Sequence, residues 1–577
     1  MKEKKDTKKV KLQKSKKEKS NNESNQLKKK QIVFGIIAVI LIAIFCVSMT
    51  PVTLQNDTFY TIKIGEQITE TGIDMQEHFS WHPDLSYTYP HWLYDLLTYF
   101  IYNIFGMTGI YVTTCILSAI LGISIYLVNK KLIKNQWLSF ILSLIVIYVI
   151  RGYIAARAQL VTFILFIWLI YFIERFLKTR KIRYTVGIIL IATLIANLHA
   201  AVWPFIFILF LPFIGEYIIA VLAETFIYRK YEKWYYKIKI ALLSNKNITT
   251  KNKEEKLEKT KQKLNELEAI VDKIKIKRDK ELENPYKIKL RKNKNVKWLI
   301  LVMIITAFTG LLTPLGDTPY TYLYKTMQGN TTQNINEHLP MTLIDETEAL
   351  SAIVIFIALL TFTKSKIRLS DLFMIGGLCY LMIASRRQIT MFAIIGSVIL
   401  NRLISNVIET YEKGGMERIF DSISKKLGYV VIIVAVLGLS YHFAKPKFDD
   451  EYIDETSYPV QACDYILEII DLGTARFYNE YNYGSYMLFR GIPVFIDSRA
   501  DLYAPEFSGK KDDIFSDFIN VSSIGTFYED IFEKYDITHA IMYKNSKMNM
   551  IIEKTHDANY KKLYEDDYFV IYQRLNA

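Results

Sequence analysis

Acidic and histidine side chains gather among aromatic residues in the stretch Asp57–His91, which follows the first apolar run of the chain. Asp57 comes first, about two helical turns beyond the end of that run. A carboxylate at such a place could accept the proton of an attacking hydroxyl group while nearby cations stabilise a departing phosphate. It could equally be a solvated surface acid, so its meaning depends on what the rest of the chain places beside it.

Three histidines and three acids of this stretch could instead hold a divalent metal ion: His78, His82, His91, Asp74, Glu77 and Asp84. Their spacing is irregular, whereas metal-binding motifs in one segment are usually compact. Hydrogen bonding and packing at a membrane interface explain the same residues without a metal. A divalent metal therefore stays an alternative that the spacing does not favour, and we predict no metal ligands and no certain cofactor.

Apolar runs of membrane-spanning length position these residues. The chain has 577 residues, of which 51% are hydrophobic, and its apolar residues are concentrated in runs near the length that crosses a hydrocarbon core. The predicted spans lie at about 32–50, 107–128, 136–150, 158–177, 184–198, 202–223, 297–313, 349–363, 371–385, 389–404 and 428–443. This pattern predicts a polytopic α-helical membrane protein with about eleven transmembrane helices.

Basic residues orient the predicted spans. The formal net charge is +14, and lysine is concentrated in 1–30 and 229–297, both next to apolar runs. Cytoplasmic loops carry an excess of lysine and arginine, so both segments are predicted to be cytoplasmic and the C-terminus extracytoplasmic. Membrane orientation and attraction to membrane lipids account for the charge, and we predict no nucleic-acid partner.

The composition divides the chain into three parts. Residues 1–30 are predicted to be a disordered basic tail. Residues 31–443 form the transmembrane domain, with a first extracytoplasmic loop at 51–91 and a basic insert at 229–297 that contains a short coiled coil or helical hairpin. Residues 444–577 are predicted to form a small extracytoplasmic α/β domain. Its expected strands are Ala475–Tyr478, Val494–Asp497, Ala540–Tyr543 and Tyr568–Gln573.

Cations interrupt the outer turns, where the charge rule predicts few of them: Arg151, Arg157, His199, Lys325, Arg386 and Arg387. A cation beside an apolar phase usually has a partner or a task, and the planar fork of arginine suits phosphate oxygens. Convergence of these side chains would create a site for the phosphate or diphosphate headgroup of a lipid. The alternative is ordinary ion pairing with acids on the same side, namely Asp57, Asp95, Glu337 and Asp345.

Polar residues alternate after a predicted strand in the segment VFIDSRADLY, which contains Asp497, Arg499 and Asp501. They could help to bind an acceptor. They could equally form a buried ion pair that closes the α/β domain, and we favour this structural interpretation.

Seven segments, read together, resemble one family. The first is DTFYTIKIGEQITETGIDMQEHFSW followed by PHWLYDLL, and the others are ARAQLVTFILFIW, ANLHAAVWPF, LTPLGDTPYTY, INEHLPM, ASRRQITMFAI and YNEYNYGSYMLFRGIPVFIDSRADLY. On these segments the chain resembles the GT-C superfamily of polytopic glycosyltransferases, which includes protein mannosyltransferases and lipid A aminoarabinose transferases. It is most similar to a poorly characterised bacterial branch of such proteins.

The resemblance implies a sugar donor linked to polyprenyl phosphate and transfer at the outer face of the bacterial cell membrane. The acceptor would be a glycan, a lipid or a protein. It also implies a catalytic acid in the first outer loop, and Asp57 is the residue that matches it. The family often has a second acid directly after this one, where the chain has Thr58, which leaves activity and any metal requirement open. Arg157, Arg386 and Arg387 lie in turns where phosphate-binding residues would be expected.

Two other classes of function fit the same residues. A transporter or flippase of lipid-linked or polyanionic envelope precursors would use the cations to pass a headgroup. An inactive scaffold of envelope assembly would use the cytoplasmic insert and the outer domain for docking. A transporter needs ionisable residues near mid-membrane, whereas the cations here lie at the ends of the spans, which favours chemistry at the outer surface.

Overall fold

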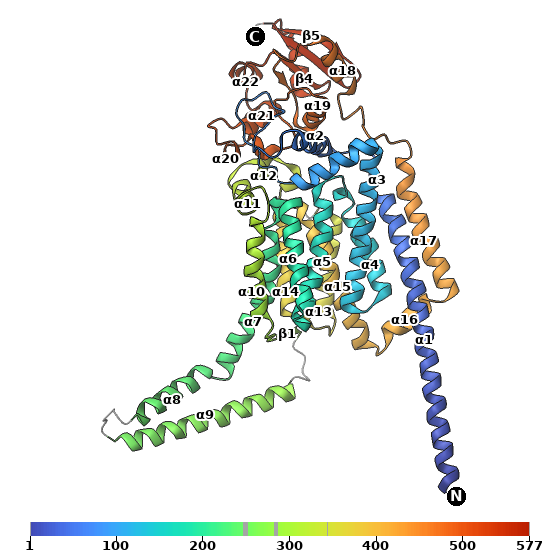
Figure 1. The fold of residues 1–577 in the computed structure, drawn as a ribbon, viewed down its shortest axis with the longest axis vertical. Coiled ribbons are helices and arrows are strands. Elements are labelled where there is room, and N and C mark those ends of the chain that lie inside the picture. The colour runs from blue at the N-terminus through green and yellow to red at the C-terminus, as the bar shows by residue number, and fades with distance from the viewer. Residues whose placement is uncertain (1, 246–251, 282–286, 343, 345, 576–577) are drawn as a thin grey trace.

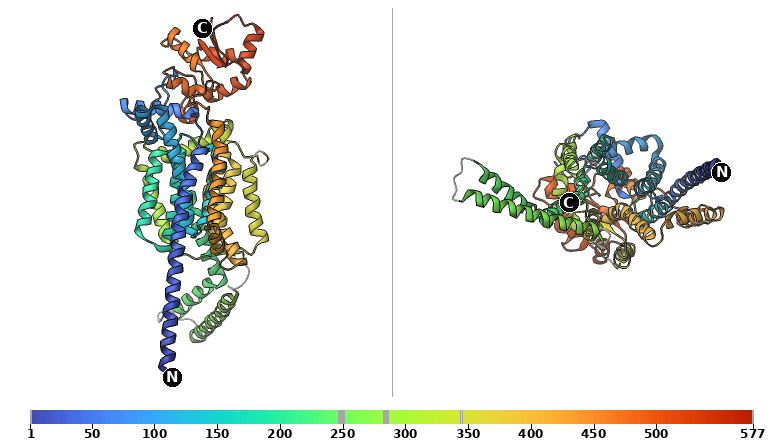
Figure 2. Two further views of the ribbon diagram at one scale, coloured as in Figure 1. Left: turned by 90° about the vertical axis from the view of Figure 1, so that its right-hand side faces the viewer. Right: turned by 90° about the horizontal axis from the view of Figure 1, so that it is seen from below.

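The structure, a computed structural model, describes residues 2–245, 252–281, 287–342, 344 and 346–575. A helical bundle occupies the middle of an elongated molecule (Figure 1). The C-terminal domain covers one end of the bundle, and the N-terminus and a helical hairpin extend from the other end (Figures 1 and 2). The two most basic segments therefore extend from the same end of the bundle, opposite the C-terminal domain, but to different sides (Figure 2).

The bundle is built from helices that coincide with the predicted apolar runs. Their bounds are α1 (Lys2–Met49), α3 (Trp92–Ile133), α4 (Gln136–Val149), α5 (Ala158–Thr179), α6 (Ile182–Leu198), α7 (Phe205–Ile227), α10 (Val296–Ala307), α13 (Thr347–Phe362), α14 (Leu369–Ala384), α15 (Ile389–Tyr411) and α17 (Lys426–Ala444). Among the described residues, α1, α3, α5, α7, α15 and α17 include stretches long and apolar enough to cross a membrane, and the other five are shorter apolar helices. The chain is a multi-pass membrane protein, and the exact number of crossings stays a prediction.

Helix α3 is broken at Gly106, whose φ of 62° is not helical. Glycine adopts positive φ without the steric cost that a Cβ atom brings. The part of α3 before Gly106 lies obliquely across the end of the bundle, and the part after it runs down through the bundle (Figure 1). The break brings residues 51–91, the predicted first outer loop, over the ends of the other helices (Figure 1).

Helix α1 begins at Lys2 and includes residues 2–30, the described part of the predicted basic tail. Those residues include neither glycine nor proline and are rich in lysine, which favours helix.

The basic insert folds as a hairpin of α8 (Lys230–Ser244) and α9 (Lys253–Glu281), which projects from the bundle (Figure 2). Leu267 and Val271 are buried, and Lys233 forms an ion pair with Glu268 of the other helix. Short strands β1 (Ile288–Lys289) and β2 (Ile367–Arg368) pair in parallel where the chain re-enters the bundle.

The C-terminal domain contains a four-stranded sheet in the order β3-β4-β6-β5. Its strands are β3 (Phe477–Tyr478), β4 (His539–Tyr543), β5 (Tyr560–Glu565) and β6 (Phe569–Arg574); β3 runs parallel to β4, and β6 is antiparallel to β4 and β5. The helices around it are α18 (Val460–Ile469), α19 (Tyr481–Phe489), α20 (Pro505–Ser508), α21 (Ile514–Ser523), α22 (Tyr528–Lys534) and α23 (Lys547–Thr555).

One predicted strand of this domain is wrong. Val494–Asp497 does not join the sheet, because it runs beside the first outer loop, where Ser80 and Val494 form an isolated parallel bridge. The backbone N–H of Val494 donates to the carbonyl of Phe79 at 3.3 Å, and the Ser80 hydroxyl donates to the carbonyl of Val494 at 2.9 Å. The apolar pattern identified an extended segment but not its partner.

The first outer loop and the C-terminal domain share one hydrophobic core, separate from the core of the bundle. Helix α2 (Asn56–Thr71) contributes Phe59, whose ring lies 5.0 Å from that of Tyr458 and 5.1 Å from that of Tyr486. Phe59 is fully buried. The loop is therefore held between two folded parts, and this packing fixes the start of α2.

Candidate functional site

Asp57 lies in the first turn of α2, where a carboxylate is stabilised by the helix N-terminus. Its neighbour Asn56 donates to the carbonyl of Tyr481 at 2.9 Å, which ties this turn to α19. Residues 58–60 are buried, whereas 22% of the Asp57 side chain is exposed. The fold therefore holds the backbone firmly and leaves the carboxylate accessible.

Arg157, at the start of α5, bridges two acids from distant loops. Its Nε lies 3.0 Å from Oδ2 of Asp57, and its Nη1 donates to Glu337 Oε1 at 3.0 Å. Glu337 belongs to a short 3₁₀ turn, Asn336–His338. Burial alone would lower the pKa of Arg157, but the charges of Asp57 and Glu337 outweigh it and raise that pKa above its usual value. Arg157 thus forms ion pairs with two of the acids that were suggested as its partners.

The same electrostatics act on Glu337. Burial would raise the pKa of Glu337, but the positive charges of Arg157 and Arg387 hold it below its usual value. Glu337 is therefore a carboxylate at neutral pH. Its side chain is 36% exposed, so the bridge stands at the edge of the site and is open to solvent.

Arg386 and Arg387 lie beside this bridge, in the 3₁₀ turn Arg386–Gln388 between α14 and α15. Arg387 donates to Gln159 Oε1 at 2.5 Å, and Arg386 donates to Asn336 Oδ1 at 2.9 Å. Among the described residues, neither guanidinium has a carboxylate within 4.0 Å, and the buried Nε of Arg386 lacks a hydrogen-bond partner. The turn thus presents positive charge that the described side chains do not neutralise.

Two histidines complete the surroundings of Arg387: His199 is buried, and the side chain of His91 is 19% exposed. The rings of His91 and His199 are 5.2 Å apart, edge to face, and His199 Nδ1 lies 3.0 Å from the hydroxyl of Thr162. Burial and the charges of Arg387 and Arg157 lower the pKa of His91 to about 3. Burial, His91 and Arg387 lower the pKa of His199 well below its usual value. We predicted from the sequence that His199 is one of the cations of the site, but this lowered pKa makes it neutral at physiological pH.

Two other predicted cations are engaged elsewhere. Arg151 pairs with Glu348 at 3.2 Å and stacks 4.2 Å above the ring of Tyr148. Lys325 lies 5.7 Å from the ring of Phe507 in the C-terminal domain. Neither forms an ion pair with Asp57 or Glu337 in the described part of the chain.

Of the remaining two suggested acid partners, Asp95 forms no ion pair with an arginine among the described residues. Asp95 is fully buried, with Oδ1 4.0 Å from Nδ1 of His91. Asp345 lies outside the described residues.

Asp497 and Arg499 form a buried ion pair, which is the structural alternative to acceptor binding for this segment. Arg499 Nη2 donates to Asp497 Oδ2 at 2.6 Å and to Glu77 Oε1 of the first loop at 3.0 Å. These three side chains are at most 3% exposed, so an acceptor could not reach them.

Asp501 instead holds the loop that carries Glu337. Its carboxylate accepts hydrogen bonds from Tyr322 and Thr331, each at 2.8 Å. Tyr322 lies in α11 (Thr318–Gln328), and Thr331 begins α12 (Thr331–Asn334). Asp501 therefore fastens the C-terminal domain to this outer segment.

The histidines of the first loop also have structural partners. The ring of His82 stacks on Trp81 with centroids 4.2 Å apart, and its Nε2 lies 2.9 Å from the carbonyl oxygen of Phe495. His78 pairs with Asp74 at 2.7 Å. Within the ranges that the structure describes, no group of three or more His, Cys, Asp or Glu side chains could hold a metal ion.

Sequence reasoning did not single out two residues that contact these arginines: Glu337 beside Arg157, and Gln159 beside Arg387. Glu337 was considered only as one of several acids that could neutralise an arginine, and Gln159 was not considered. Gln159 lies two residues after Arg157 in the segment ARAQLV, so it could have been noticed, whereas nothing local in INEHLPM shows that Glu337 meets Arg157.

Comparison with known proteins places this geometry in a known fold. No family model matches the chain, and no curated protein matches its sequence. The apo oligosaccharyltransferase of Archaeoglobus fulgidus has a similar structure, with a TM-score of 0.52 and 12% identity, covering 88% of this chain and 69% of that chain. The fold is GT-C-like. Apo ArnT from Cupriavidus metallidurans also matches, with a TM-score of 0.46 and 9% identity over 95% of this chain and 98% of that chain.

The similarity confirms the predicted resemblance at the level of the fold. In this GT-C-like fold, the first outer loop, the turn before α5 and the turn before α15 converge at the end of the bundle that faces the C-terminal domain.

Proposed function

We propose that this protein is a membrane glycosyltransferase that transfers a sugar from a polyprenyl-phosphate-linked donor to an extracytoplasmic glycan, lipid or protein. One observation carries the proposal: the partly exposed Asp57 is bridged through Arg157 to Glu337, beside two arginines without a carboxylate partner among the described residues. The GT-C-like fold, shared with an oligosaccharyltransferase, supports it.

The proposed orientation puts the C-terminal domain outside the bacterial cell membrane and the N-terminus in the cytoplasm. The lysine-rich α1 and the basic hairpin extend from the same end of the bundle (Figure 1), as expected for cytoplasmic segments. Transfer would then take place on the outer face, at the end that carries Asp57.

In the proposed reaction the Asp57 carboxylate accepts the proton of the acceptor hydroxyl as its oxygen attacks the anomeric carbon of the donor sugar. A glycosidic C–O bond forms, the C–O bond to the phosphate breaks, and its electron pair leaves with the phosphate. Arg386, Arg387 and Arg157 stabilise the negative charge that develops there. His199, as a neutral ring, lines the phosphate site, and the step assigns no role to a metal.

In this proposal the ion pair between Asp57 and Arg157 determines the order of donor binding and proton transfer. In the structure Arg157 is divided between two carboxylates. A bound lipid phosphate would compete with Asp57 for the guanidinium and thereby release the carboxylate to act as a base. Donor binding would precede proton transfer, and Glu337 would keep Arg157 in place during the exchange.

The proposal is tested with the purified full chain in proteoliposomes, a panel of labelled polyprenyl-phosphate sugars and a panel of acceptors. Asp57→Asn should lower transfer by about 10²–10⁴-fold, the usual contribution of a general base. Glu66→Gln is the matched control, because Glu66 is a carboxylate on the same helix that pairs with Lys63, and it should transfer normally.

Two outcomes would replace the proposal. Passage of lipid-linked sugar across the bilayer without transfer would identify a transporter. Neither transfer nor binding of polyprenyl-phosphate sugars, together with cross-linking to envelope proteins, would identify a scaffold.

A further inference from the structure

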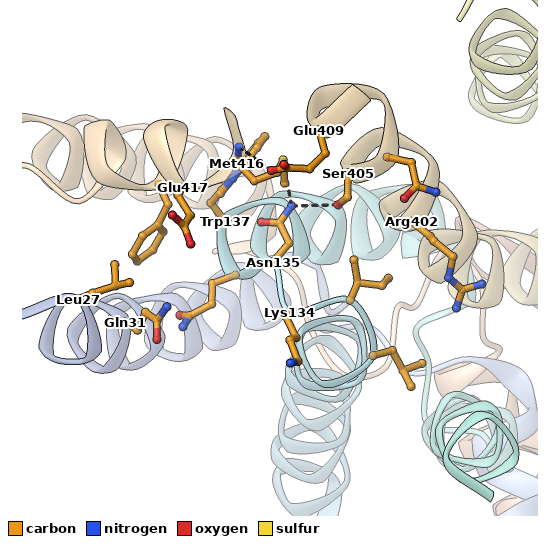
Figure 3. A pocket seen from close by; sticks show the side chains of 15 residues that line it. Leu27, Gln31, Lys134, Asn135, Trp137, Arg402, Ser405, Glu409, Met416 and Glu417 are labelled. Carbon is orange, nitrogen blue, oxygen red and sulfur yellow. Dashed lines mark hydrogen bonds between the residues drawn. The ribbon is translucent and has the colours of Figure 1, made fainter. Parts of the chain in front are cut away.

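Two hollows share Gln31 and Gln136 at the end of the bundle away from the C-terminal domain. The first, of about 490 Å³, lies among α1, α4, α15 and α16 (Gly415–Ile423) and is shown in Figure 3. Its lining mixes both signs of charge, with Lys134 and Arg402 opposed by Glu409 and Glu417 (Figure 3). This lining therefore favours neither an anionic nor a cationic ligand.

The second hollow, here called the α1–α3 groove, has a volume of about 580 Å³ and separates polar from apolar lining. Its polar end is formed by Lys28, Gln31, Tyr126, Lys130 and Gln136, and its apolar length by Ile32, Ile36, Val39, Ile40 and Leu127. From Lys28 to Ile40 the helix rises about 18 Å, close to the ~15 Å thickness of one hydrocarbon leaflet. The groove thus has the length and polarity of one lipid molecule.

Gly35 opens the polar end of the groove. A Cβ atom at this position would stand 3.4 Å from Nζ of Lys130, 3.8 Å from the hydroxyl of Tyr126 and 3.9 Å from Oε1 of Gln136. Glycine is unfavourable within a helix, so this position gives up helix propensity where three polar side chains approach the backbone. The hydroxyl of Tyr126 donates to Oε1 of Gln136 at 3.5 Å, and a larger side chain at position 35 would crowd Lys130.

Lys28 and Lys130 differ from the neighbouring Lys30, which forms an ion pair with Asp421 at 2.7 Å. Nζ of Lys130 lies 5.5 Å from the ring of Tyr126, which lines the same groove. Among the described side chains, no carboxylate lies within 4.0 Å of Lys28 or Lys130. Unneutralised cations next to an apolar phase call for an anionic partner.

We propose that the α1–α3 groove binds one anionic phospholipid, with its phosphate on Lys28 and Lys130 and an acyl chain along Ile32, Ile36 and Ile40. The three isoleucines are 53–62% exposed in the protein alone, so an acyl chain would cover apolar surface that the fold leaves bare. This inference goes beyond the proposed function and rests on the proposed orientation only for the choice of the cytoplasmic leaflet.

Native mass spectrometry of the full chain tests the proposal. The detergent-purified protein is titrated with phosphatidylglycerol and, separately, with phosphatidylcholine of identical acyl chains. One phosphatidylglycerol should bind in preference to phosphatidylcholine, and Lys130→Gln and Lys28→Gln should each weaken it by about fivefold, the usual effect of one lysine at an anionic membrane surface. Gly35→Leu, which crowds Lys130 and keeps both charges, should also weaken binding.

Lys131→Gln is the matched control, since it removes the same charge from the adjacent residue of α3, outside the groove. It should leave phosphatidylglycerol binding unchanged. Three results would overturn the proposal: equal binding of both lipids, an equal loss with Lys131→Gln, or full displacement of phosphatidylglycerol by inorganic phosphate. The last would mean that the groove holds a free anion and not a lipid.

Discussion

Two clusters of arginines and carboxylates lie at opposite ends of the bundle and differ in balance and exposure. The lower cluster, at the end away from the C-terminal domain, pairs two arginines with two acids: Glu174, Arg368, Asp371 and Arg402. Their side chains are only 6–17% exposed. The upper cluster, Asp57, Arg157, Glu337, Arg386 and Arg387, sets three arginines against two acids, and its paired side chains are 22–36% exposed.

The difference separates a structural network from a candidate site. Arg402 donates to both carboxylate oxygens of Asp371, at 2.5 and 2.6 Å, and to Glu174 at 2.9 Å. Each charge in the lower cluster is thus matched within the protein, and a ligand would have to break an existing pair. In the upper cluster a phosphate would meet positive charge that is still available.

The largest expected effect comes from breaking the lower cluster. Arg368→Gln leaves Glu174 and Asp371 with one arginine in a buried setting, and removal of one partner of a buried pair usually costs about 3–5 kcal/mol. We expect a clearly lower midpoint of thermal unfolding in detergent. Arg387→Gln, at the upper end, should cost less than about 1 kcal/mol. Equal destabilisation by the two variants would contradict the comparison.

The sequence predicts the bundle well and the clusters poorly, for a physical reason. Membrane spans are encoded locally, because some twenty consecutive apolar residues are needed to cross the bilayer, and each predicted run coincides with a helix. Ion pairs are not local. Arg157 meets Glu337, and Arg368 meets Glu174, only because the helices between them fold back.

The C-terminal part shows a second limit. The segment Val494–Asp497 has the apolar content of a strand, and it is extended, but it pairs with Ser80 of the first loop and not with the sheet. Strand β5 was missed, since its sequence YKKLYE is largely exposed and lacks an apolar run. Composition identifies extended segments, whereas pairing depends on which neighbours the fold supplies.

The next effect is on donor binding at the upper cluster. Arg387→Gln should weaken binding of polyprenyl phosphate by about ten- to a hundredfold, because a hydrogen bond to a charged group contributes about 1.5–3 kcal/mol. Equilibrium binding of labelled polyprenyl phosphate in nanodiscs measures this. Arg402→Gln, at the lower cluster, should leave the affinity of the folded fraction unchanged, and an equal loss there would mean that overall charge, not the upper turn, determines binding.

A smaller effect concerns pH, because the upper cluster is lined by a partly buried histidine. Arg157, Arg387, His199 and Asp95 surround His91, whose pKa is lowered to about 3 by burial and by the two arginines. In the unfolded chain this ring titrates near pH 6.5. Its contribution to stability is therefore complete above pH 6.5 and is lost as the pH falls from there toward 3.

The expected slope is up to about 1.4 kcal/mol per pH unit for one such histidine. Thermal unfolding midpoints between pH 7 and 4.5 measure it. His91→Gln should flatten the pH dependence, with His556→Gln as the control, since His556 is an exposed residue of the C-terminal domain. An unchanged slope in His91→Gln would show that His91 is protonated in the folded protein.

The smallest expected effect separates two arginines that the sequence treats alike. Arg151 and Arg157 lie in the same outer turn, but Arg151 is 40% exposed and pairs with Glu348, away from Asp57. Exposed ion pairs contribute about 0.2–1 kcal/mol, so Arg151→Gln should change stability only slightly and leave polyprenyl phosphate binding intact. Arg157→Gln should impair binding, because it removes the guanidinium that joins Asp57 to Glu337. If Arg151→Gln weakened binding as much as Arg157→Gln, the site would have to extend along the whole turn, and convergence on Asp57 would no longer define it.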